Sequence, residues 1–380
     1  MASKSAGYHA EVVVRPSSAM ADALALVAPG QPLRDGIERV LQANRGLLLV
    51  VGDGPDVLSI CTGGFLLDAE FSPQRLSELA KMDGAVILSP NADRIARANV
   101  HLMPNATIST IETGTRHRTA ERVARSIDVP VVSVSAAMGL VTVYRRDTRH
   151  VLQDERRLHE RVRQALQTTR RFRARFDVAL TALSALEIAD TVTVRDVAAV
   201  LQPAGLLDGI ADEVKVDLVE LGEDGRLLRL QLEEVLDGID PVRRLVVRDY
   251  IHCHTPAHAE GRDGHRDASS DEVDHALEVL AGLSTDDLLE VRRVSAVLGL
   301  GHSDPDAPVE PRGYRLLHRL PRFPEALVDR IVEHFGGLQR IMRTSVADLE
   351  EVEGVGEARA RSVKEGLARL AEASILDRYS

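Results

Sequence analysis

The first 147 residues alternate short apolar runs with amphipathic segments, as the strands and helices of an α/β domain do. Residues 47–51 form an apolar run between glycines, which predicts a buried strand. Residues 57–61 are expected to pair with it across the turn at residues 52–55, and residues 63–65 to form a loop. The further predicted strands are 85–88, 131–134 and 140–144, and the predicted helices are 19–27, 33–43, 73–81 and one that begins near residue 114. We expect a mixed sheet covered by helices.

The middle of the chain has a helical pattern. Residues 147–190 contain no glycine or proline, and their apolar residues recur at broadly helical spacings, so a long helix is predicted to leave the first domain. The helical pattern continues to about residue 300, with Thr191 and Ser284 as candidate helix caps. We expect an all-α spine there, followed by a linker at residues 302–312 that contains three prolines.

The last 70 residues contain an internal repeat. Residues 320–326 align with residues 352–358 at an offset of 32, which predicts a duplicated helix-turn-helix unit. The second copy carries Gly354 and Gly356 on either side of Val355, whereas the first copy has Arg322 and Pro324 in place of the glycines. We expect the second copy to bind a partner and the first to pack. The predicted domains are therefore residues 1–147, 148–310 and 311–380.

Composition narrows the possible partners. The chain has 44% hydrophobic and 28% charged residues, as a globular protein does, and its 3% aromatic content with no Trp argues against a surface that stacks on bases. The net charge of −11 is unevenly distributed, because residues 211–300 hold 21 acidic and 10 basic residues and residues 311–380 hold 11 acidic and 12 basic ones. We expect any polyanion to avoid the middle of the chain and to contact its end.

The cysteines and the hydropathy of the chain indicate the cellular compartment of the protein. Cys61 and Cys253 lie far apart and provide no disulfide framework, and residues 1–15 lack the apolar core of a signal peptide. The apolar run at residues 47–51 is too short to cross a bilayer. These features predict a cytoplasmic protein with no membrane contact.

The segment from Gly114 to Ala120 places Arg116, His117 and Arg118 in the first turn of a predicted helix. Cations are disfavoured there by the helix dipole, and a bound polyphosphate would relieve that mismatch. The plainer interpretation is a solvated helix end. The chain has no P-loop motif, and Gly52-Asp53-Gly54 lacks the third glycine of a dinucleotide fingerprint, so phosphate binding would have to use side chains.

Asp83 precedes Gly84 at the entry to the predicted strand 85–88. Asp-Gly is a common turn signal, and the chain contains seven such pairs, so Asp83 is notable only because it shares a domain with the Arg-His-Arg segment. A carboxylate and a cationic clamp in one domain can act on one ligand.

Two other motifs are weaker. The hairpin of Gly354, Val355 and Gly356 is followed by Arg359, Arg361 and Lys364, a pattern typical of a helix-hairpin-helix that binds the DNA backbone. Its plainer interpretation is an interhelical turn, and nearby glutamates would weaken DNA binding. The histidines and the cysteine between His252 and His265 resemble metal ligands, but they lack a paired Cys-x-x-Cys, and we interpret the segment as a surface loop.

Three features occur in one order: Met82-Asp83-Gly84-Ala85, the Gly114–Ala120 segment, and a helical spine that ends in helix-hairpin-helix repeats. In this order the chain resembles the diadenylate cyclase family, in its DNA integrity scanning branch, along essentially its whole length. The resemblance implies that two ATP molecules condense into cyclic di-AMP with release of two pyrophosphates. It also implies catalysis between two facing copies, within a homo-octamer whose DNA-binding ends point outward.

The resemblance also implies roles for residues. Asp83 would orient and help deprotonate the ribose 3′-hydroxyl, directly or through Mg²⁺ or Mn²⁺. The residues that would hold the phosphates are Arg116, His117, Arg118, Thr115 and Thr119, with Ser135 in reach of a phosphate. Gly84 and Ala85 would line the ribose, and Leu102 would meet the adenine. Relatives often have an acidic residue after Val134-Ser135, where this chain has Ala136-Ala137, so a second carboxylate ligand for the metal is in doubt.

These observations favour an ATP-consuming nucleotidyltransferase regulated by branched or damaged DNA. An alternative from another class is a non-catalytic, nucleotide-binding scaffold protein that recognises DNA junctions. A third interpretation, a nucleotide-hydrolysing repair factor, is weakened by the missing P-loop.

Overall fold

The computed structural model describes residues 18–252, 269–300, 304–321 and 323–378. Residues 1–15, most of the histidine-rich segment (Cys253, His254, His258 and His265) and Arg322 lie outside the described residues. The chain divides into two compact units, Met1–Ala165 with Asp212–Gln231, and Leu166–Ala211 with Leu232–Ser380.

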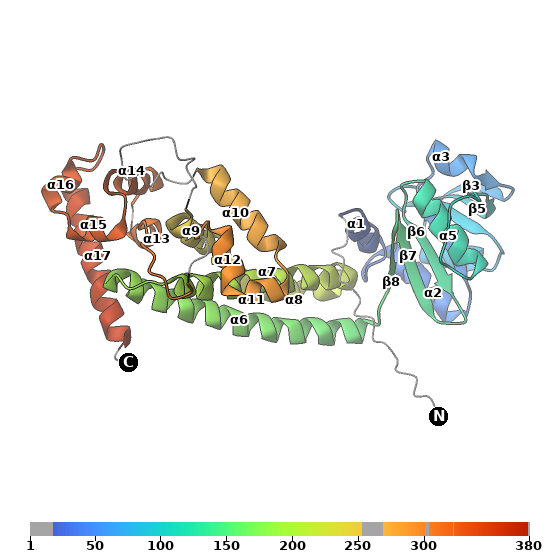
Figure 1. Ribbon diagram of the computed structural model, residues 1–380. Coiled ribbons are helices and arrows are strands. Elements are labelled where there is room, and N and C mark those ends of the chain that lie inside the picture. The colour runs from blue at the N-terminus through green and yellow to red at the C-terminus, as the bar shows by residue number, and fades with distance from the viewer. Residues whose placement is uncertain (1–17, 253–268, 301–303, 322, 379–380) are drawn as a thin grey trace, which may run out of the picture. The chain divides into compact units, whose positions relative to one another are not determined.

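The first unit contains an eight-stranded mixed sheet in the order β2-β5-β4-β1-β6-β7-β8, with β3 paired to β5 (Figure 1). Strand β1 is parallel to β4 and antiparallel to β6, and the other pairs are antiparallel. Its elements are α1 Ser18–Leu26, α2 Pro32–Gln42, β1 Leu47–Val51, α3 Pro55–Ser59, β2 Cys61–Thr62, β3 Phe65–Glu70, α4 Pro73–Leu79, β4 Ala85–Leu88, β5 Arg94–Leu102, α5 Thr115–Ser126, β6 Val131–Ser135, β7 Leu140–Arg145 and β8 Thr148–Val151.

Both faces of the central strand of the sheet are buried. Leu47, Leu49 and Val51 of β1 pack with residues of α1, α2 and α4, while Leu48 and Val50 pack with residues of α3 and α5. A central strand covered on both faces is a continuous apolar run rather than an alternating one, which is why β1 is recognisable in the sequence. The predicted mixed sheet covered by helices is confirmed.

Three predictions for this unit were wrong. Residues 57–61 lie largely in α3, because Pro55 starts a helix there and β1 already pairs with β4 and β6. Phe65 begins strand β3 and is not part of a loop. The long helix starts at Glu155, because residues 148–151 form β8. Strands β3 and β5 were not predicted, since β3 is largely exposed and β5 contains Arg94, Arg97 and Asn99, so neither shows a simple apolar alternation.

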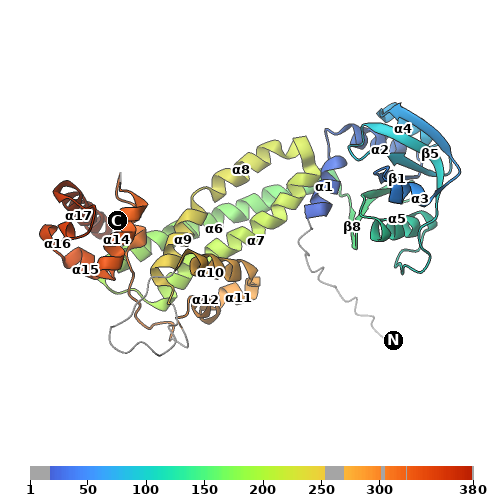
Figure 2. The same ribbon diagram turned by 90° about the horizontal axis from the view of Figure 1, so that it is seen from above.

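The next helices confirm the predicted all-α spine. In the second unit α6 and α7 run side by side in opposite directions (Figure 2). Ser284 caps α11 by accepting the N–H of Asp287, as predicted, but Thr191 does not cap α7, which begins at Val194. These elements are α6 Glu155–Ala189, α7 Val194–Leu221, η1 Gly222–Gly225, α8 Arg226–Leu236, α9 Ile239–Tyr250, α10 Ser270–Gly282, α11 Thr285–Leu289 and α12 Val291–Val297. None of the helices in the described ranges combines the length and apolarity that a membrane span requires.

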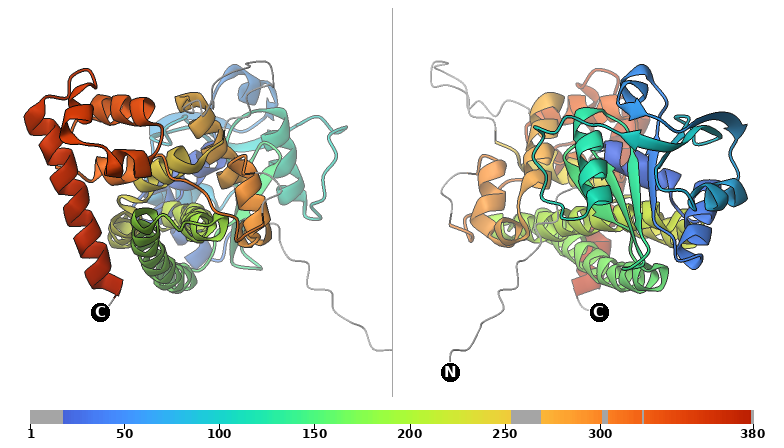
Figure 3. Two further views of the ribbon diagram at one scale, coloured as in Figure 1. Left: turned by 60° about the vertical axis from the view of Figure 1, so that its left-hand side comes forward. Right: turned by 90° about the vertical axis from the view of Figure 1, so that its right-hand side faces the viewer.

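The C-terminal helices reproduce the internal repeat (Figure 3, left). They are α13 Tyr314–His318, α14 Glu325–Phe335, α15 Leu338–Arg343, α16 Val346–Glu350 and α17 Glu357–Arg378, so α16 and α17 begin 32 residues after α13 and α14. Equivalent core positions are buried in both copies, for example Ile331 and Val363. The duplicated unit is confirmed.

The first copy is embedded in the second unit. Residues 311–317 are all buried, and the Asp249 carboxylate accepts the backbone N–H groups of Gly313, Tyr314 and Arg315. The Arg315 guanidinium pairs with Glu187 of α6 at 2.5 Å. A charged side chain buried this deeply needs such a partner, so the first copy is fixed to the helices before it. Its predicted packing role agrees with these contacts.

Candidate functional site

Four strand ends meet at one edge of the sheet in the first unit. Leu48 lies opposite Ala85 in the parallel pair β1 and β4, and Leu47 lies opposite Val134 in the antiparallel pair β1 and β6. Ala85 also lies opposite Val100 in the antiparallel pair β4 and β5, so β1 and β4 begin where β5 and β6 end. Since neighbouring strands lie about 4.8 Å apart, the edge from β5 to β6 spans about 14 Å. The predicted site residues that this register brings together are Asp83, Gly84, Ala85, Leu102 and Ser135.

Gly84 is required for the close approach of β4 and β5. A Cβ at Gly84 would lie 2.7 Å from the backbone Cα and C atoms of Asn99, which adopts a left-handed φ of 56°. Ala85 is 2% exposed and packs in the core, so only its backbone is left to face a ligand. A ligand at this edge could therefore reach these two residues only through their backbone.

Asp83 is exposed in the turn before β4. Ser135 ends β6 and is followed by Ala136 and Ala137, which supply no carboxylate. Within the described ranges no three His, Cys, Asp or Glu side chains gather as a metal site. A single carboxylate provides too few ligands for a magnesium-type ion, which would need further oxygen ligands from a bound molecule or from water.

Helix α5 brings a cation to the same edge. Gly114 is its N-cap and provides no side-chain cap, so the first N–H groups of the helix are left for other acceptors. The Arg116 guanidinium lies over Gly46, the residue before β1, because a Cβ at Gly46 would be 2.2 Å from Nη1 of Arg116. Gly46 thus provides the space that Arg116 occupies, and no sequence motif identified it.

The side chains in the first turn of α5 differ in their ion pairs and hydrogen bonds. Arg116 and Arg118 are exposed, and neither forms an ion pair with any described residue. The Thr119 hydroxyl donates to the carbonyl of Thr115 at 2.9 Å, which leaves only its lone pairs for a ligand. Two unpaired arginines beside free helix N–H groups can bind an anion strongly.

His117 is held by residues that the sequence analysis missed. Its Nδ1 lies 2.8 Å from the Tyr144 hydroxyl, which donates to Oε1 of Glu112 at 3.0 Å, and Arg149 donates to the same oxygen at 2.6 Å. Burial alone would raise the pKa of Glu112, but the hydrogen bonds from Arg149 and Tyr144 and nearby positive charge lower it overall. Burial and the Glu112 carboxylate raise the pKa of Tyr144. No spacing in the sequence connects these residues.

The hairpin of the second repeat copy is held by arginines. Gly354 has a φ of 88°, which favours glycine, and its carbonyl accepts from Arg359 at 2.7 Å. Arg330 of α14 donates to the neighbouring carbonyl of Glu353 at 2.9 Å. Val355 is buried, so its side chain is directed into the core. Both arginines hold hairpin carbonyls.

Of the remaining predicted DNA-binding residues, Arg361 and Lys364 have partners within the protein, whereas Gly356 is open. Arg361 pairs with Glu357 one turn earlier in α17, and both side chains are exposed. Lys364 donates to the carbonyls of Met342 and Thr344, each at 2.6 Å, at the end of α15. Gly356 has open space around the position of a Cβ. The hairpin backbone near Gly356 is therefore more available to a ligand than the Lys364 ammonium.

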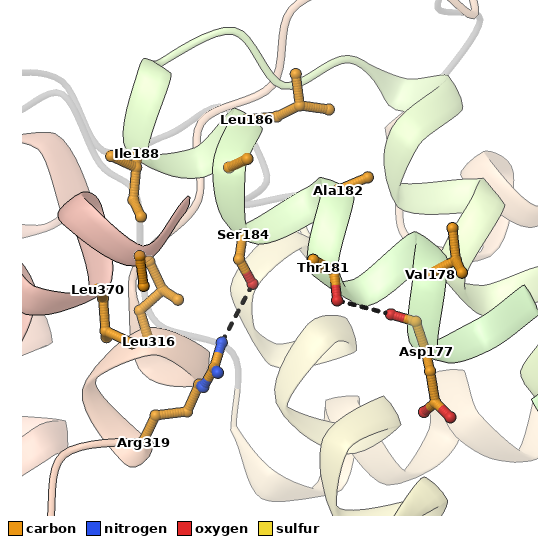
Figure 4. A pocket seen from close by; sticks show the side chains of 12 residues that line it. Asp177, Val178, Thr181, Ala182, Ser184, Leu186, Ile188, Leu316, Arg319 and Leu370 are labelled. Carbon is orange, nitrogen blue, oxygen red and sulfur yellow. Dashed lines mark hydrogen bonds between the residues drawn. The ribbon is translucent and has the colours of Figure 1, made fainter. Parts of the chain in front are cut away.

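A cavity of about 670 Å³ in the second unit is separate from these residues (Figure 4). Its walls are mostly apolar, and its hydrogen bonds join Thr181 to the carbonyl of Asp177 at 3.0 Å and Arg319 to Ser184 at 3.4 Å. No residue predicted from the sequence to bind nucleotide or DNA lines it.

Two family models match the chain. The model described as DisA bacterial checkpoint controller nucleotide-binding matches residues 34–149, which include the sheet edge and α5. The model of the DisA bacterial checkpoint controller linker region matches residues 152–306. Fold, site and models define the class of protein, a nucleotide-binding α/β domain joined to a helical linker.

Relatives of full length identify the family. The DNA integrity scanning protein DisA of Streptomyces coelicolor is 52% identical over 95% of this chain and 94% of its own length. The protein of the same name from Kineococcus radiotolerans is 50% identical over 96% of this chain and 98% of its own length. The chain belongs to the DisA family of DNA integrity scanning proteins. Among solved structures, DacA from Staphylococcus aureus is 21% identical over 36% of this chain and 91% of its own, with a TM-score of 0.28.

Proposed function

We propose that this chain is a diadenylate cyclase that condenses two ATP molecules into cyclic di-AMP and two pyrophosphates. The observation that carries the proposal is the meeting of Asp83, Ser135, Leu102 and Arg116 at one edge of a domain whose family is nucleotide-binding. This edge offers a carboxylate at one position and unpaired cations at another, which suits attack by a hydroxyl on a phosphate.

Each group has a distinct role in the proposal. Asp83 orients the ribose 3′-hydroxyl and accepts its proton as the α-phosphate of the other ATP is attacked. Arg116, His117 and Arg118 hold the β- and γ-phosphates and stabilise the leaving pyrophosphate, with Thr115 and Ser135 as further polar contacts. Thr119 would join them once its hydroxyl turns from the Thr115 carbonyl to donate to a phosphate. The backbones of Gly84 and Ala85 line the ribose, and Leu102 contacts the adenine.

We further propose that Asp83 contributes to holding a Mg²⁺ or Mn²⁺ ion that ATP brings into the site. An ion of this kind offsets the charge that develops on the phosphates. Because Ala136 and Ala137 supply no carboxylate, the phosphates would provide most of the remaining ligands.

The reaction requires two ATP molecules that attack one another. Two identical domains facing across a two-fold axis satisfy this requirement with one set of residues. We propose that the active species is a homo-oligomer, namely the homo-octamer that the resemblance to the diadenylate cyclase family implies. A single chain is expected to make no product.

The C-terminal repeat is proposed to bind branched or damaged DNA without reading sequence, and thereby to regulate synthesis. The proposed domains are the catalytic domain at residues 1–147, the helical spine at residues 148–310 and the DNA-binding domain at residues 311–380. The protein is proposed to be cytoplasmic. The exposed hairpin at Gly356 supports backbone contacts with phosphates.

Incubation of the full chain with ATP and Mn²⁺, followed by chromatographic identification of the product, tests the proposal. Cyclic di-AMP is the expected product. Formation of ADP would identify a nucleotide hydrolase. ATP binding without turnover would favour the alternative, a non-catalytic scaffold that binds nucleotide and DNA junctions.

A further inference from the structure

His117 has a defined tautomer, because its neighbours leave only one arrangement of hydrogens. A tyrosine hydroxyl carries a single hydrogen, and an ionised carboxylate can only accept. Arg149 and Tyr144 both donate to Glu112, and the pKa of Glu112 is lowered, so Glu112 is ionised. The Tyr144 hydrogen is therefore committed to Glu112, and its oxygen must accept the hydrogen of His117 Nδ1.

The other ring nitrogen, Nε2, remains for a ligand. The Cδ2 atom of His117, which is bonded to Nε2, lies 3.7 Å from the position that a Cβ would take at Gly114, the N-cap of α5. This side of the ring thus lies against the start of the helix, where the first N–H groups and the unpaired arginines are found. The opposite side of the ring, with Nδ1, is bonded to Tyr144.

The neighbours of His117 are fixed in turn. Tyr144 is 1% exposed and lies edge-on to the His117 ring, with 6.2 Å between the ring centroids. The loop that carries Glu112 is bound to α5 through Arg122, which donates to the carbonyl of Ile108 at 3.0 Å, and Arg125, which donates to that of Ser109 at 2.7 Å. The residues that hold the His117 ring are therefore themselves fixed, Tyr144 by burial and the loop of Glu112 by hydrogen bonds to α5.

We infer that Tyr144 and Glu112 are positioning residues that hold Nδ1 of His117 in its protonated form and reserve Nε2 for a phosphate oxygen of the bound nucleotide. The inference rests on the proposed function in one respect, that the nucleotide phosphates bind at the start of α5. A phosphate oxygen can only accept, so a ring that donates to it through Nε2 carries hydrogens on both nitrogens, with Tyr144 accepting from Nδ1 and the Glu112 carboxylate balancing the charge.

The tautomer is measured without any turnover. The full chain is labelled with ¹⁵N-histidine, the His117 signal is assigned with His117→Gln, and the shifts are read at a pH where the ring is neutral. The expected wild-type signal is that of an Nδ1-protonated ring, and Tyr144→Phe is expected to shift it toward the Nε2-protonated form. An Nε2-protonated ring in the wild type would overturn the inference.

Affinity for 3′-deoxy-ATP, which has no attacking hydroxyl, provides the second measurement. Loss of one hydrogen bond to a histidine that contacts phosphate predicts about a tenfold rise in Kd for Tyr144→Phe. The matched control is Tyr250→Phe, which removes another buried hydroxyl bonded to a glutamate, Glu187, at 2.8 Å. It should leave Kd and the His117 signal unchanged. Wild-type affinity in Tyr144→Phe would contradict the inference.

Glu112→Gln tests the same arrangement whether or not Tyr144→Phe folds. The amide oxygen still accepts from Tyr144, so the Nδ1-protonated form should persist and Kd should rise by less than about tenfold. A changed tautomer in this variant, or a rise in Kd of about tenfold or more, would count against positioning through the hydroxyl. If the wild type makes no cyclic di-AMP, the proposed function fails, but the tautomer result stands by itself.

Discussion

The sheet edge of the first unit and the second repeat copy both place arginines beside glycines, but the arginines are used differently. Arg116 occupies the space over Gly46 and forms no ion pair with a described residue. Arg359 and Arg330 instead donate to carbonyls of the hairpin around Gly354. The same residue pattern thus leaves charge free for a ligand in one place and stabilises the backbone in the other.

This difference indicates how each region would bind an anion. At the sheet edge the ligand would be held by side chains, whose loss should affect binding directly. At the hairpin the ligand would be held mainly by backbone N–H groups, and side-chain substitutions should act mostly through the fold. The following predictions separate the two modes, in order of decreasing effect, first on synthesis and ligand binding and then on stability.

The largest effect is expected for Asp83→Asn. The substitution removes the base that the proposal assigns to the 3′-hydroxyl, and a general base contributes about 10²- to 10⁴-fold in rate. Cyclic di-AMP synthesis should fall by at least about 100-fold, while the Kd for 3′-deoxy-ATP stays nearly unchanged. Loss of nucleotide binding in this variant would show that Asp83 acts in binding instead.

Gly46→Ala tests the side-chain mode at the sheet edge. The new Cβ would displace the Arg116 guanidinium, which is the flexible end of a side chain, so the fold should persist. Loss of one charge-assisted contact should raise the Kd for 3′-deoxy-ATP about tenfold. Gly54→Ala is the matched control, because nothing lies within 4 Å of its Cβ position and its φ is −66°. Equal effects of both substitutions would contradict the role of Gly46.

Gly356→Val tests the backbone mode at the hairpin. Open space around this position predicts that the fold tolerates the side chain, while a DNA phosphate can no longer approach closely. DNA affinity in a salt titration should fall about fivefold, equivalent to about 1 kcal/mol, and basal synthesis should not change. A parallel fall in synthesis would show that the two regions are not separate modules.

Lys364→Met tests whether a predicted DNA contact is in fact structural. Its ammonium caps two carbonyls at the end of α15, so the substitution should lower the free energy of unfolding by about 1–3 kcal/mol, measured by urea denaturation. DNA affinity per folded molecule should change little. A large loss of affinity at unchanged stability would restore Lys364 as a DNA contact.

Arg361→Gln should have the smallest effect on stability. It breaks an exposed ion pair with Glu357, and such pairs contribute about 0.3–0.5 kcal/mol. A change in urea denaturation larger than about 1 kcal/mol would mean that Arg361 has a structural partner beyond this pair.

Helices, strands and repeats could be predicted from the sequence where a local pattern of residues determines them. The central strand β1 is a continuous apolar run, and the 32-residue repeat is visible in both alignment and helix boundaries. The Arg-His-Arg segment does begin a helix. These features depend on neighbours in sequence, so periodicity and spacing reveal them.

Features that depend on tertiary contacts were missed. Strand β5 is polar in part, and pairing with β4 and β3 makes it a strand in spite of that. Gly46 and Tyr144 lie far from Arg116 and His117 in the chain, and the packing of α5 on the sheet brings them together. Likewise, the presence of a lysine on a predicted helix does not reveal that the Lys364 ammonium donates to backbone carbonyls.

The central claim is most directly tested by the stoichiometry of the reaction with ATP and Mn²⁺. Pyrophosphate and cyclic di-AMP are measured together for the wild-type chain and for Asp83→Asn at equal concentrations of folded protein. The account predicts two pyrophosphates for each cyclic di-AMP in the wild type, and at least about 100-fold less of both products in the variant. Orthophosphate with ADP, or equal synthesis by both chains, would contradict it.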